Sequence, residues 1–379
     1  MRVLHVGPLP PPYGGVEVLL DLLLQSQQNR KEYTIDCLNT SRGVNYRRYR
    51  TAQFSLDGLT RRILLAWRLV RKLQQFRPDI VHYQVGRADW SFVSDALNLS
   101  IIWICGSKLV VHLHNAPEQS LAQNQSVFPG RNRITQFFWR AVMQRIHCLI
   151  VLSEKYRQAF SQFISSNKIF VVPDTCSDDL LRIDRTSIDQ IRSQGVFTIV
   201  FLGRLTQEKG VSDLLQAAYM LGQHGHVFKL WLCGTALTSV AEMELKQLVE
   251  RLGLGDKVVF AGAVGTDKKY TLLQNADVVV LPSYSESFGM ALLEGMAASL
   301  PVIGTRVGCI DEIIVENETG LIYSPGDINA LEEALSYLAM NPQTRQQMGS
   351  AGRARFRRLY SRSYVVELIG TIYRDIGRL

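Results

Sequence analysis

The sequence lacks the motifs that mark several common kinds of metal site. It contains no Asp-x-Asp, no Cys-x-x-Cys and no group of histidines at zinc spacing, so its motifs give no sign of a bound metal ion. Its six cysteines stand singly along the chain, which is typical of reduced core residues in a cytosolic protein and not of a disulfide framework. We therefore expect no metal and no cofactor.

Long apolar runs are also missing. The most apolar stretch, ALNLSIIWICGSKLVVHLH, is interrupted by Asn98, Gly106 and Lys108 before it reaches the roughly 20 residues that span a bilayer. The N-terminal MRVLHVGPLPPPYGG alternates apolar residues and then enters a proline loop, which predicts a first strand and not a signal peptide. We expect a cytoplasmic protein without a transmembrane helix.

The chain has enough apolar residues for more than one core. It has 379 residues, of which 46% are hydrophobic and 20% charged, so two globular domains are predicted. The net charge is uneven, at +9 over residues 1–190, −6 over 191–352 and +5 over 353–379. The basic first segment favours an anionic partner, and no stacking-aromatic motif points to nucleic acid.

Strands and helices alternate along the chain. Buried parallel strands are predicted for RVLHV, DIVHYQ, KLVVHLH, CLIVLS and KIFVVP, and then for FTIVFLG, FKLWLCG, KVVFAG, DVVVLP and LPVIGT. The pattern predicts an α/β protein of two doubly wound domains, 1–180 and 195–352, which face a cleft. The polar stretch 174–195 is the expected linker, and the helix expected within 355–379 returns to the first domain.

Two carboxylates stand eight positions apart in SYSESFGMALLEGMAASLPVIGT. Glu286 is predicted at the entrance of a helix and Glu294 inside it, roughly 12 Å further along the helix axis. Carboxylates accept hydrogen bonds from sugar hydroxyls, and a helix N-terminus attracts phosphate. A ligand with hydroxyls at both ends and phosphates between them fits. Alternatively, Glu286 merely caps the helix and Glu294 lies on a solvated face.

Cations and glycines complete the pattern. Arg204 and Lys209 follow a strand in FLGRLTQEKGVSDLL, where both can reach one diphosphate, although a plain exposed basic loop also explains them. Gly14 and Gly15 allow a ligand close to the backbone, or form a tight turn. In VHLHNAPE, one of the two histidines is expected at the cleft mouth and the other on the sheet face, and either is also explained by a structural role.

Together, GRLTQEKG, ADVVVLPSYSESFGMALLEGMAASLPVIGTRVG and ENETGLIYSPGD resemble the donor-binding half of the retaining GT-B glycosyltransferases of family 4. The E-x7-E spacing is met by Glu286 and Glu294. The resemblance is strong from about residue 196 to 345 and looser before it. It implies a GT-B architecture and a hexosyltransferase that uses a UDP- or GDP-linked sugar.

The resemblance also implies residue roles. Arg204 and Lys209 would bind the donor diphosphate, and Glu294 the ribose hydroxyls. Glu286, with the amides of Ser287, Phe288 and Gly289, would hold the transferred sugar. Gly14 and Gly15 would lie beside the diphosphate, and His114 near the sugar and the acceptor. The expected catalytic residues are His114, Arg204, Lys209 and Glu286.

Transfer with retention of configuration is implied, in which cations and a helix end replace a metal ion at the diphosphate. Some positions depart from the family pattern. PDTCSDD at 173–179 stands where Pro-Asn-Gly is usual, Gly295 and Ser299 replace alanine and glycine, and Cys309 replaces glycine. These departures affect the hinge between the domains and the close sugar contacts.

The acceptor is expected at the first domain. LTRRILLAWRLVRKLQQF mixes apolar residues with Arg61, Arg62, Arg68, Arg71 and Lys72, which predicts a basic amphipathic helix. Such a helix either docks on the anionic inner face of a membrane, with a lipid-linked sugar as acceptor, or simply packs its apolar stripe on the sheet. A glycan or lipid-linked acceptor suggests polysaccharide or glycolipid synthesis.

Other functions remain open at this level. A sugar-nucleotide epimerase has the same architecture but needs no acceptor, and a phosphorylase would need a cofactor lysine and a far longer chain. A third alternative is an inactive nucleotide-binding scaffold, which the intact Arg204, Lys209, Glu286 and Glu294 disfavour. The sequence does not determine the base, the sugar, the acceptor, the linkage or the oligomeric state.

Overall fold

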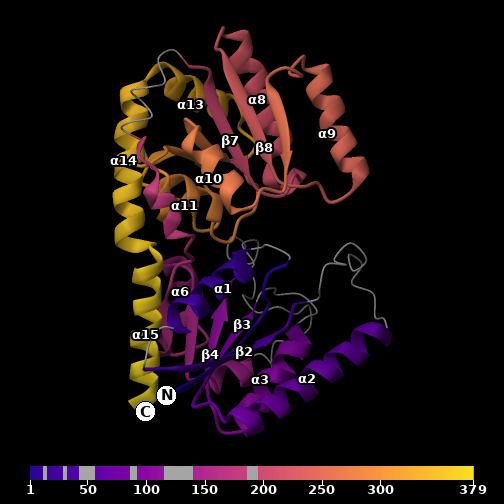
Figure 1. The fold of residues 1–379 in the computed structure, drawn as a ribbon, viewed down its shortest axis with the longest axis vertical. Helices are drawn as coiled ribbons and strands as arrows, with labels where there is room; N and C mark the ends of the chain where they lie inside the picture. Colours follow the sequence, from indigo (N-terminus) through magenta and orange to yellow (C-terminus); the bar gives the residue numbers. More distant parts are fainter. Residues whose placement is uncertain are drawn as a thin grey trace. The chain divides into compact units, whose positions relative to one another are not determined.

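The computed structural model describes residues 1–11, 15–28, 32–41, 56–85, 92–114, 140–185 and 195–378. Contacts divide the chain into two compact units, one of residues 1–175 and 362–379 and one of residues 176–361. The first unit thus ends five residues before the predicted position 180. Both units contain parallel sheets (Figure 1).

The first unit contains a six-stranded parallel sheet in the order β2-β1-β3-β4-β5-β6. Its strands are β1 (Arg2–Gly7), β2 (Thr34–Asn39), β3 (Ile80–Val85), β4 (Lys108–Leu113), β5 (Cys148–Val151) and β6 (Ile169–Val171). The sequence analysis missed β2, which lies at the sheet edge and carries the polar residues Thr34 and Asp36 in its short run. An edge strand is only partly buried, so it lacks the continuous apolar signal of the central strands.

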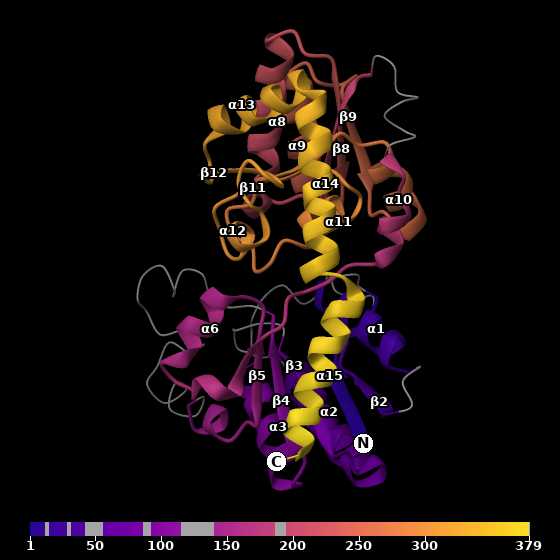
Figure 2. The same cartoon turned by 90° about the vertical axis from the view of Figure 1, so that its left-hand side faces the viewer.

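Helices cover this sheet. They are α1 (Gly15–Gln28), α2 (Leu56–Phe76), α3 (Phe92–Ile104), α6 (Glu154–Ser161) and α15 (Arg362–Arg378), with a 3₁₀ turn, η2 (Ser166–Lys168). α2 lies beside α3, and α15 lies beside α1. In Figure 2, α15 runs along the strands of this unit.

The C-terminal helix α15 is part of the core of the first unit. Its apolar side chains, Val365, Val366, Ile369, Ile372, Tyr373 and Ile376, are buried in one cluster with strand residues such as Val3, Ile80 and Val110. Lys108 Nζ on β4 donates to the carbonyl of Ile376 at 2.7 Å. The helix α15 therefore covers one face of the first sheet. The single helix predicted within 355–379 is in fact parts of two helices, α14 and α15.

The second unit contains a six-stranded parallel sheet in the order β12-β11-β10-β7-β8-β9. Its strands are β7 (Phe197–Leu202), β8 (Phe228–Cys233), β9 (Val258–Gly262), β10 (Val278–Leu281), β11 (Val302–Thr305) and β12 (Gly320–Tyr323). When the strands are numbered from β7, the first strand of the unit, this is the strand order of doubly wound dinucleotide-binding domains. The strand order reverses between β7 and β10, which pair directly. In such sheets a ligand binds beyond the carboxyl ends of the strands at this switch point.

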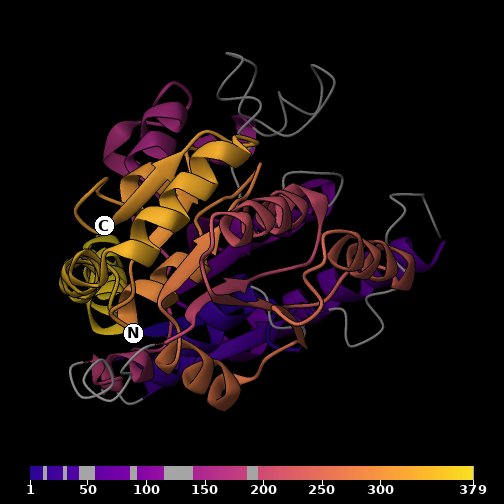
Figure 3. The same ribbon diagram turned by 90° about the horizontal axis from the view of Figure 1, so that it is seen from above.

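The helices of the second unit lie on both faces of its sheet (Figure 3). They are α8 (Val211–Gln223), α9 (Ser239–Arg251), α10 (Thr266–Gln274), α11 (Met290–Ala297), α12 (Ile310–Ile313), α13 (Ile328–Met340) and α14 (Pro342–Leu359), with the 3₁₀ turns η3 (Asp178–Arg182) and η4 (Gln207–Lys209). α8 packs against α13, and α11 packs against α14. Side chains cap two of these helices, since Thr238 accepts from the amide of Ala241 and Asp327 from that of Ala330.

All six cysteines are free thiols. Cys148, Cys176, Cys233 and Cys309 are buried, as expected of core residues, whereas Cys105 is exposed. Among the described helices, none is both long enough and apolar enough to cross a bilayer.

Candidate functional site

Two loops meet at the switch point of the second sheet. One follows β7 and contains η4; the other follows β10. The amide of Tyr284 donates to the carbonyl of Glu208 at 2.8 Å, and Gly210 has a φ of +65°. A Cβ atom at Gly210 would lie 1.9 Å from the carbonyl oxygen of Pro282, so glycine is required for the two loops to approach this closely.

This approach brings together Lys209 and Glu286, two residues that the sequence analysis assigned to one site. Lys209 Nζ lies 2.5 Å from Glu286 Oε2 and donates to the carbonyl of Ser285 at 3.2 Å. The two side chains are only 14% and 16% exposed. A cation, which can bind phosphate, and a carboxylate, which can accept hydrogen bonds from hydroxyl groups, therefore lie side by side.

Arg204 lies in the same loop region, three residues before η4. Its side chain is exposed, and its guanidinium makes no hydrogen bond or ion pair with any residue in the described ranges. An exposed guanidinium has several donors in a planar arrangement that matches phosphate oxygens. The loop after β7 thus presents one cation already paired with Glu286 and a second that is exposed to solvent.

The helix α11 begins directly after these loops. Gly289 caps it with a φ of +102° and, being glycine, offers no side chain to the amides of its first turn. Phe288 is buried and packs edge-on against Tyr360, with ring centroids 6.1 Å apart, which fixes the position of the helix start. First-turn amides without a capping side chain are left to water or to a ligand, and the helix dipole favours an anion there.

Glu294, inside α11, does not lie on a solvated face. Its side chain is 13% exposed, and its Oε1 lies 2.6 Å from Lys269 Nζ on α10. Desolvation lowers the pKa of Lys269, but the charge and hydrogen bond of Glu294 outweigh it, and the net shift is upward. Burial raises the pKa of the nearby Cys233 thiol to about 12, so this thiol is neutral. The sequence analysis missed Lys269, because its neighbour Glu294 is 25 residues further along the chain.

His114, the remaining predicted catalytic residue, lies in the first unit at the end of β4. It is buried, and its Nε2 lies 2.6 Å from Gln84 Oε1 on β3. Its Nδ1 lies 3.4 Å from Asp174 Oδ1, beyond the end of β6. The sequence analysis missed both partners, which the pairing of neighbouring strands brings to His114.

The expected orientation of the two histidines is wrong. The sequence predicts different orientations for His112 and His114, but their rings stack, with centroids 4.2 Å apart and planes at 28°. Residues two apart in a strand point the same way, and both rings are buried. Burial, with the neighbouring histidines, lowers the pKa of His112 well below its usual value, so His112 is neutral.

The predicted glycine pair is only partly described. Gly14 lies outside the described residues, and Gly15 is the exposed first residue of α1. Glu17 stands in the first turn of this helix, where burial raises the pKa of its carboxyl despite a hydrogen bond from its own amide.

Comparison with solved structures defines the class of fold. Sucrose-phosphate synthase from Thermosynechococcus elongatus superposes with a TM-score of 0.77 at 18% identity and covers 99% of each chain. Anabaena HepE, solved in complex with UDP-glucose, superposes with a TM-score of 0.72 at 19% identity over 100% of each chain. Together with the two doubly wound sheets, these similarities show a GT-B fold.

Sequence comparison identifies the family. The model of the family described as Glycosyltransferase Family 4 matches residues 13–176, and that of Glycosyl transferases group 1 matches residues 184–355. The two matches together span most of the chain, which belongs to the family 4 glycosyltransferases.

Individual relatives match parts of the chain. D-inositol 3-phosphate glycosyltransferase of Arthrobacter sp. (strain FB24) is 35% identical over 158 residues, 41% of this chain and 38% of that protein. N-acetyl-alpha-D-glucosaminyl L-malate synthase of Bacillus anthracis is 25% identical over 322 residues, 83% of this chain and 80% of that protein. The chain spans about two fifths of the length of the D-inositol 3-phosphate glycosyltransferases that it matches.

Proposed function

We propose that the chain is a retaining hexosyltransferase of the cytoplasm. It transfers a sugar from a UDP- or GDP-linked donor to a glycan or a lipid-linked sugar, in the synthesis of cell-surface polysaccharide or glycolipid. The observation that carries the proposal is the contact between Lys209 and Glu286 at the switch point of the second sheet. A nucleotide-sugar needs both kinds of group there, a cation for its phosphates and a carboxylate for its hydroxyls.

The donor would lie along the start of α11. Arg204 and Lys209 would bind the diphosphate, Glu286 and the amides of the first turn the transferred sugar, and Glu294 the ribose. Glu294 supports this assignment because it is nearly buried and Lys269 holds it in place. HepE has the same fold and was solved with UDP and with UDP-glucose, so UDP-glucose is the first donor to test.

In the proposed reaction, the bond between the anomeric carbon and the diphosphate oxygen breaks, and the acceptor hydroxyl attacks from the same face. The acceptor oxygen forms the new glycosidic bond, and its proton passes to the leaving diphosphate. Negative charge therefore grows on the diphosphate in the transition state. Arg204, Lys209 and the positive end of α11 would stabilise this charge, so we propose that transfer needs no metal ion.

The test is an assay of nucleotide release with EDTA present, using UDP-glucose, UDP-N-acetylglucosamine and GDP-mannose with glycan and lipid-linked acceptors. We expect acceptor-dependent release of one nucleotide, with the product's anomeric configuration retained in its NMR spectrum. Arg204→Ala should abolish most of this rate, whereas Arg251→Ala, at the exposed end of α9, should not. An inverted product would contradict retention, and conversion of the donor without an acceptor would favour the epimerase.

We also propose that α2 docks on an anionic membrane surface, so that the acceptor is lipid-linked. Leu69 and Leu73 of this helix are buried in the unit, which accounts for only part of its apolar face. Ile63, Leu64 and Trp67 are 62%, 53% and 55% exposed. The arginines named above accompany them on the same helix, and Arg71 lies over the Trp67 ring at 5.5 Å. Exposed apolar residues next to arginines fit a surface of anionic lipid.

Vesicle cosedimentation tests this docking. The full chain should bind vesicles containing phosphatidylglycerol at low salt and bind phosphatidylcholine vesicles much less. Trp67→Ser should weaken binding, whereas Val240→Ser, which removes an exposed apolar residue from α9, should leave it unchanged. Equal binding by the two variants, or no binding to anionic vesicles, would contradict the role of α2.

A further inference from the structure

We propose that Gln84 binds a hydroxyl group of a sugar substrate, and that Asp174 positions Gln84 through His114. The inference rests on the sugar transfer proposed above, in which His114 lies near the sugar and the acceptor, and it adds two residues to that site. Gln84 lies on β3, His114 directly after β4, and Asp174 after β6. All three stand at the carboxyl edge of the first sheet, where ligands of doubly wound domains bind.

Gln84 and His114 lie on the same face of the sheet. In the parallel register of β3 and β4, Gln84 pairs with His112, and His114 is two positions further on and points the same way as His112. The Gln84 side chain also crosses the end of β1, because a Cβ atom at Gly7 would lie only 2.6 Å from Gln84 Cγ. Glycine at position 7 therefore leaves the space that the glutamine occupies.

The amide group of Gln84 is bonded on one side only. Gln84 Oε1 lies 2.6 Å from His114 Nε2. Among the described residues, the amide nitrogen of Gln84 is buried and has no hydrogen-bond partner, and the residue as a whole is 5% exposed. Rotating the amide by half a turn exchanges its oxygen and its nitrogen, but then the oxygen is the atom without a partner. In either orientation, one amide atom of Gln84 is left for a ligand.

A sugar hydroxyl group is the ligand that fits this atom best. A buried polar atom without a partner is unfavourable, and such atoms are rare in folded proteins. A hydroxyl group both donates and accepts hydrogen bonds, so it can bond to the amide nitrogen or to the amide oxygen of Gln84. A phosphate or carboxylate oxygen would fit the nitrogen alone. The donor sugar and a glycan acceptor both carry such hydroxyl groups.

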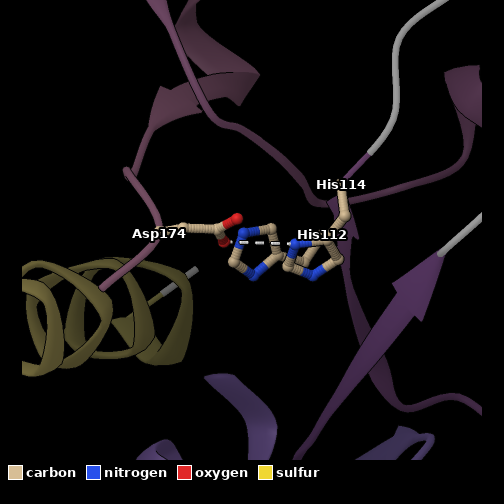
Figure 4. Close-up of side chains that lie close together, drawn as sticks. All are labelled: His112, His114 and Asp174. Atoms are coloured by element: carbon tan, nitrogen blue, oxygen red, sulfur yellow. Dashed lines mark ion pairs between the residues drawn. The ribbon is translucent and has the colours of Figure 1, made fainter. Parts of the chain in front are cut away.

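The other ring nitrogen of His114 faces Asp174. His114 Nδ1 lies 3.4 Å from Asp174 Oδ1, and the two side chains are 2% and 7% exposed. Figure 4 shows the carboxyl group of Asp174 pointing toward the imidazole rings. Within the described ranges, neither atom has another hydrogen-bond partner. A nitrogen lone pair and a carboxylate oxygen at this distance would repel each other, so Nδ1 carries a proton. Asp174 therefore fixes the ring, and with it the nitrogen that contacts Gln84.

The aspartate at this position is a departure of this chain from the family pattern. Asp174 lies in PDTCSDD, which stands where Pro-Asn-Gly is usual. An ionised carboxylate only accepts hydrogen bonds, whereas the amide of an asparagine can also donate one. Aspartate therefore determines which nitrogen of His114 carries the proton more strictly than asparagine would. The departure thus bears on His114 as well as on the hinge between the domains.

The first experiment locates the proton on His114. NMR correlation spectra of the full chain labelled with ¹⁵N-histidine distinguish protonated from unprotonated ring nitrogens, and His114→Gln assigns the signal. We expect a proton on Nδ1 in the wild type. In Asp174→Leu, which keeps a side chain of similar size but accepts no hydrogen bond, the proton should leave Nδ1. An unprotonated Nδ1 in the wild type would overturn the proposal even if the variant does not fold, and so would an unchanged spectrum in Asp174→Leu.

The second experiment finds the hydroxyl group that Gln84 binds. Transfer is measured with analogues of the donor sugar, and separately of the acceptor, that each lack one hydroxyl group. In the wild type, one analogue should lose roughly 10-fold in kcat/KM relative to its parent substrate. In Gln84→Met, which has no amide, that analogue and its parent should react equally well. The effect in the donor series would assign the hydroxyl to the transferred sugar, and the effect in the acceptor series to the acceptor.

Tyr83→Phe is the matched control. Tyr83 precedes Gln84 on β3 and points to the other face, where its hydroxyl donates to Asp95 Oδ1 at 2.8 Å. This variant should lose stability but discriminate among the analogues as the wild type does. A loss in Gln84→Met that is equal for every substrate would overturn the proposal, because it would show a structural role alone. Absence of transfer from every donor would contradict the proposed function instead, and the spectrum of His114 would still test this inference.

Discussion

Lys269 Nζ lies 2.6 Å from Glu294 Oε1, so the carboxylate predicted to bind a ribose is held by a cation from a neighbouring helix. The two side chains are 29% and 13% exposed. The ion pair therefore fixes the orientation of the Glu294 carboxylate toward α10.

The first prediction concerns this pair. Lys269→Met should lower the free energy of unfolding by about 1–2 kcal/mol, because it leaves a mostly buried carboxylate without its partner. Glu294→Gln in the same chain removes that charge and should recover part of the loss. Urea unfolding of the wild type, the two single variants and the double variant measures the coupling. Strictly additive losses would show that the two residues do not stabilise each other.

A second prediction separates sugar binding from nucleotide binding. Glu286→Gln keeps the shape of the side chain and an acceptor for Lys209, but it loses the charge that we propose for contact with the transferred sugar. Transfer should fall roughly 100-fold, because an interaction that strengthens in the transition state is weakened, while affinity for free UDP changes little. Glu250→Gln on α9 is the control. If Glu286→Gln lost as much affinity for free UDP as Glu294→Ala does, the proposed division of roles between Glu286 and Glu294 would be refuted.

A third prediction concerns backbone strain at Ser299, where the family pattern has glycine. Ser299 has a φ of +62°, a conformation that costs an L-residue about 1–2 kcal/mol. Ser299→Gly removes this strain, although the greater freedom of glycine in the unfolded chain offsets about 0.5–1 kcal/mol. We expect a net gain of about 0.5–1 kcal/mol in thermal unfolding. A loss of stability would mean that the serine hydroxyl contributes more than the strain costs.

The fourth prediction is a pH dependence at Glu17. Burial raises the pKa of its carboxyl in the folded chain. The folded chain therefore favours the neutral carboxyl group. The contribution of Glu17 to the free energy of unfolding is fully present below the pKa that Glu17 has in the unfolded chain, and it is lost as the pH rises through the pKa that it has in the folded chain. Glu17→Gln should raise the unfolding temperature at pH 7 and have little effect at pH 4. The same gain at both pH values would point to a cause other than charge.

Much of the second unit was predictable from sequence. The runs of β-branched residues identify β7 and β10, and the loops that follow them carry Arg204, Lys209 and Glu286. Parallel strands bring the loops at their carboxyl ends to one edge, so the proximity of Lys209 and Glu286 follows from the topology. The expected loop before α11 is also present, although its cap is Gly289 and not Glu286.

The partners of the site residues were not predictable in the same way. Lys269 reaches Glu294, and Gln84 and Asp174 reach His114, only because helices and strands distant in sequence pack next to each other. Neither the spacing nor the type of these residues carries that information. The predicted orientation of His112 and His114 is wrong for a different reason. Side chains of a strand alternate sides from one residue to the next, so two residues that are two positions apart lie on the same side.

Calorimetric titration of the purified chain with UDP- and GDP-sugars, with EDTA present and beside Glu294→Ala, tests the central claim most directly. The account predicts saturable binding of one nucleotide class by the wild type, with affinity lost or strongly reduced in Glu294→Ala. Binding that is unchanged in Glu294→Ala, or no binding of any nucleotide-sugar by a folded wild-type chain, would contradict it.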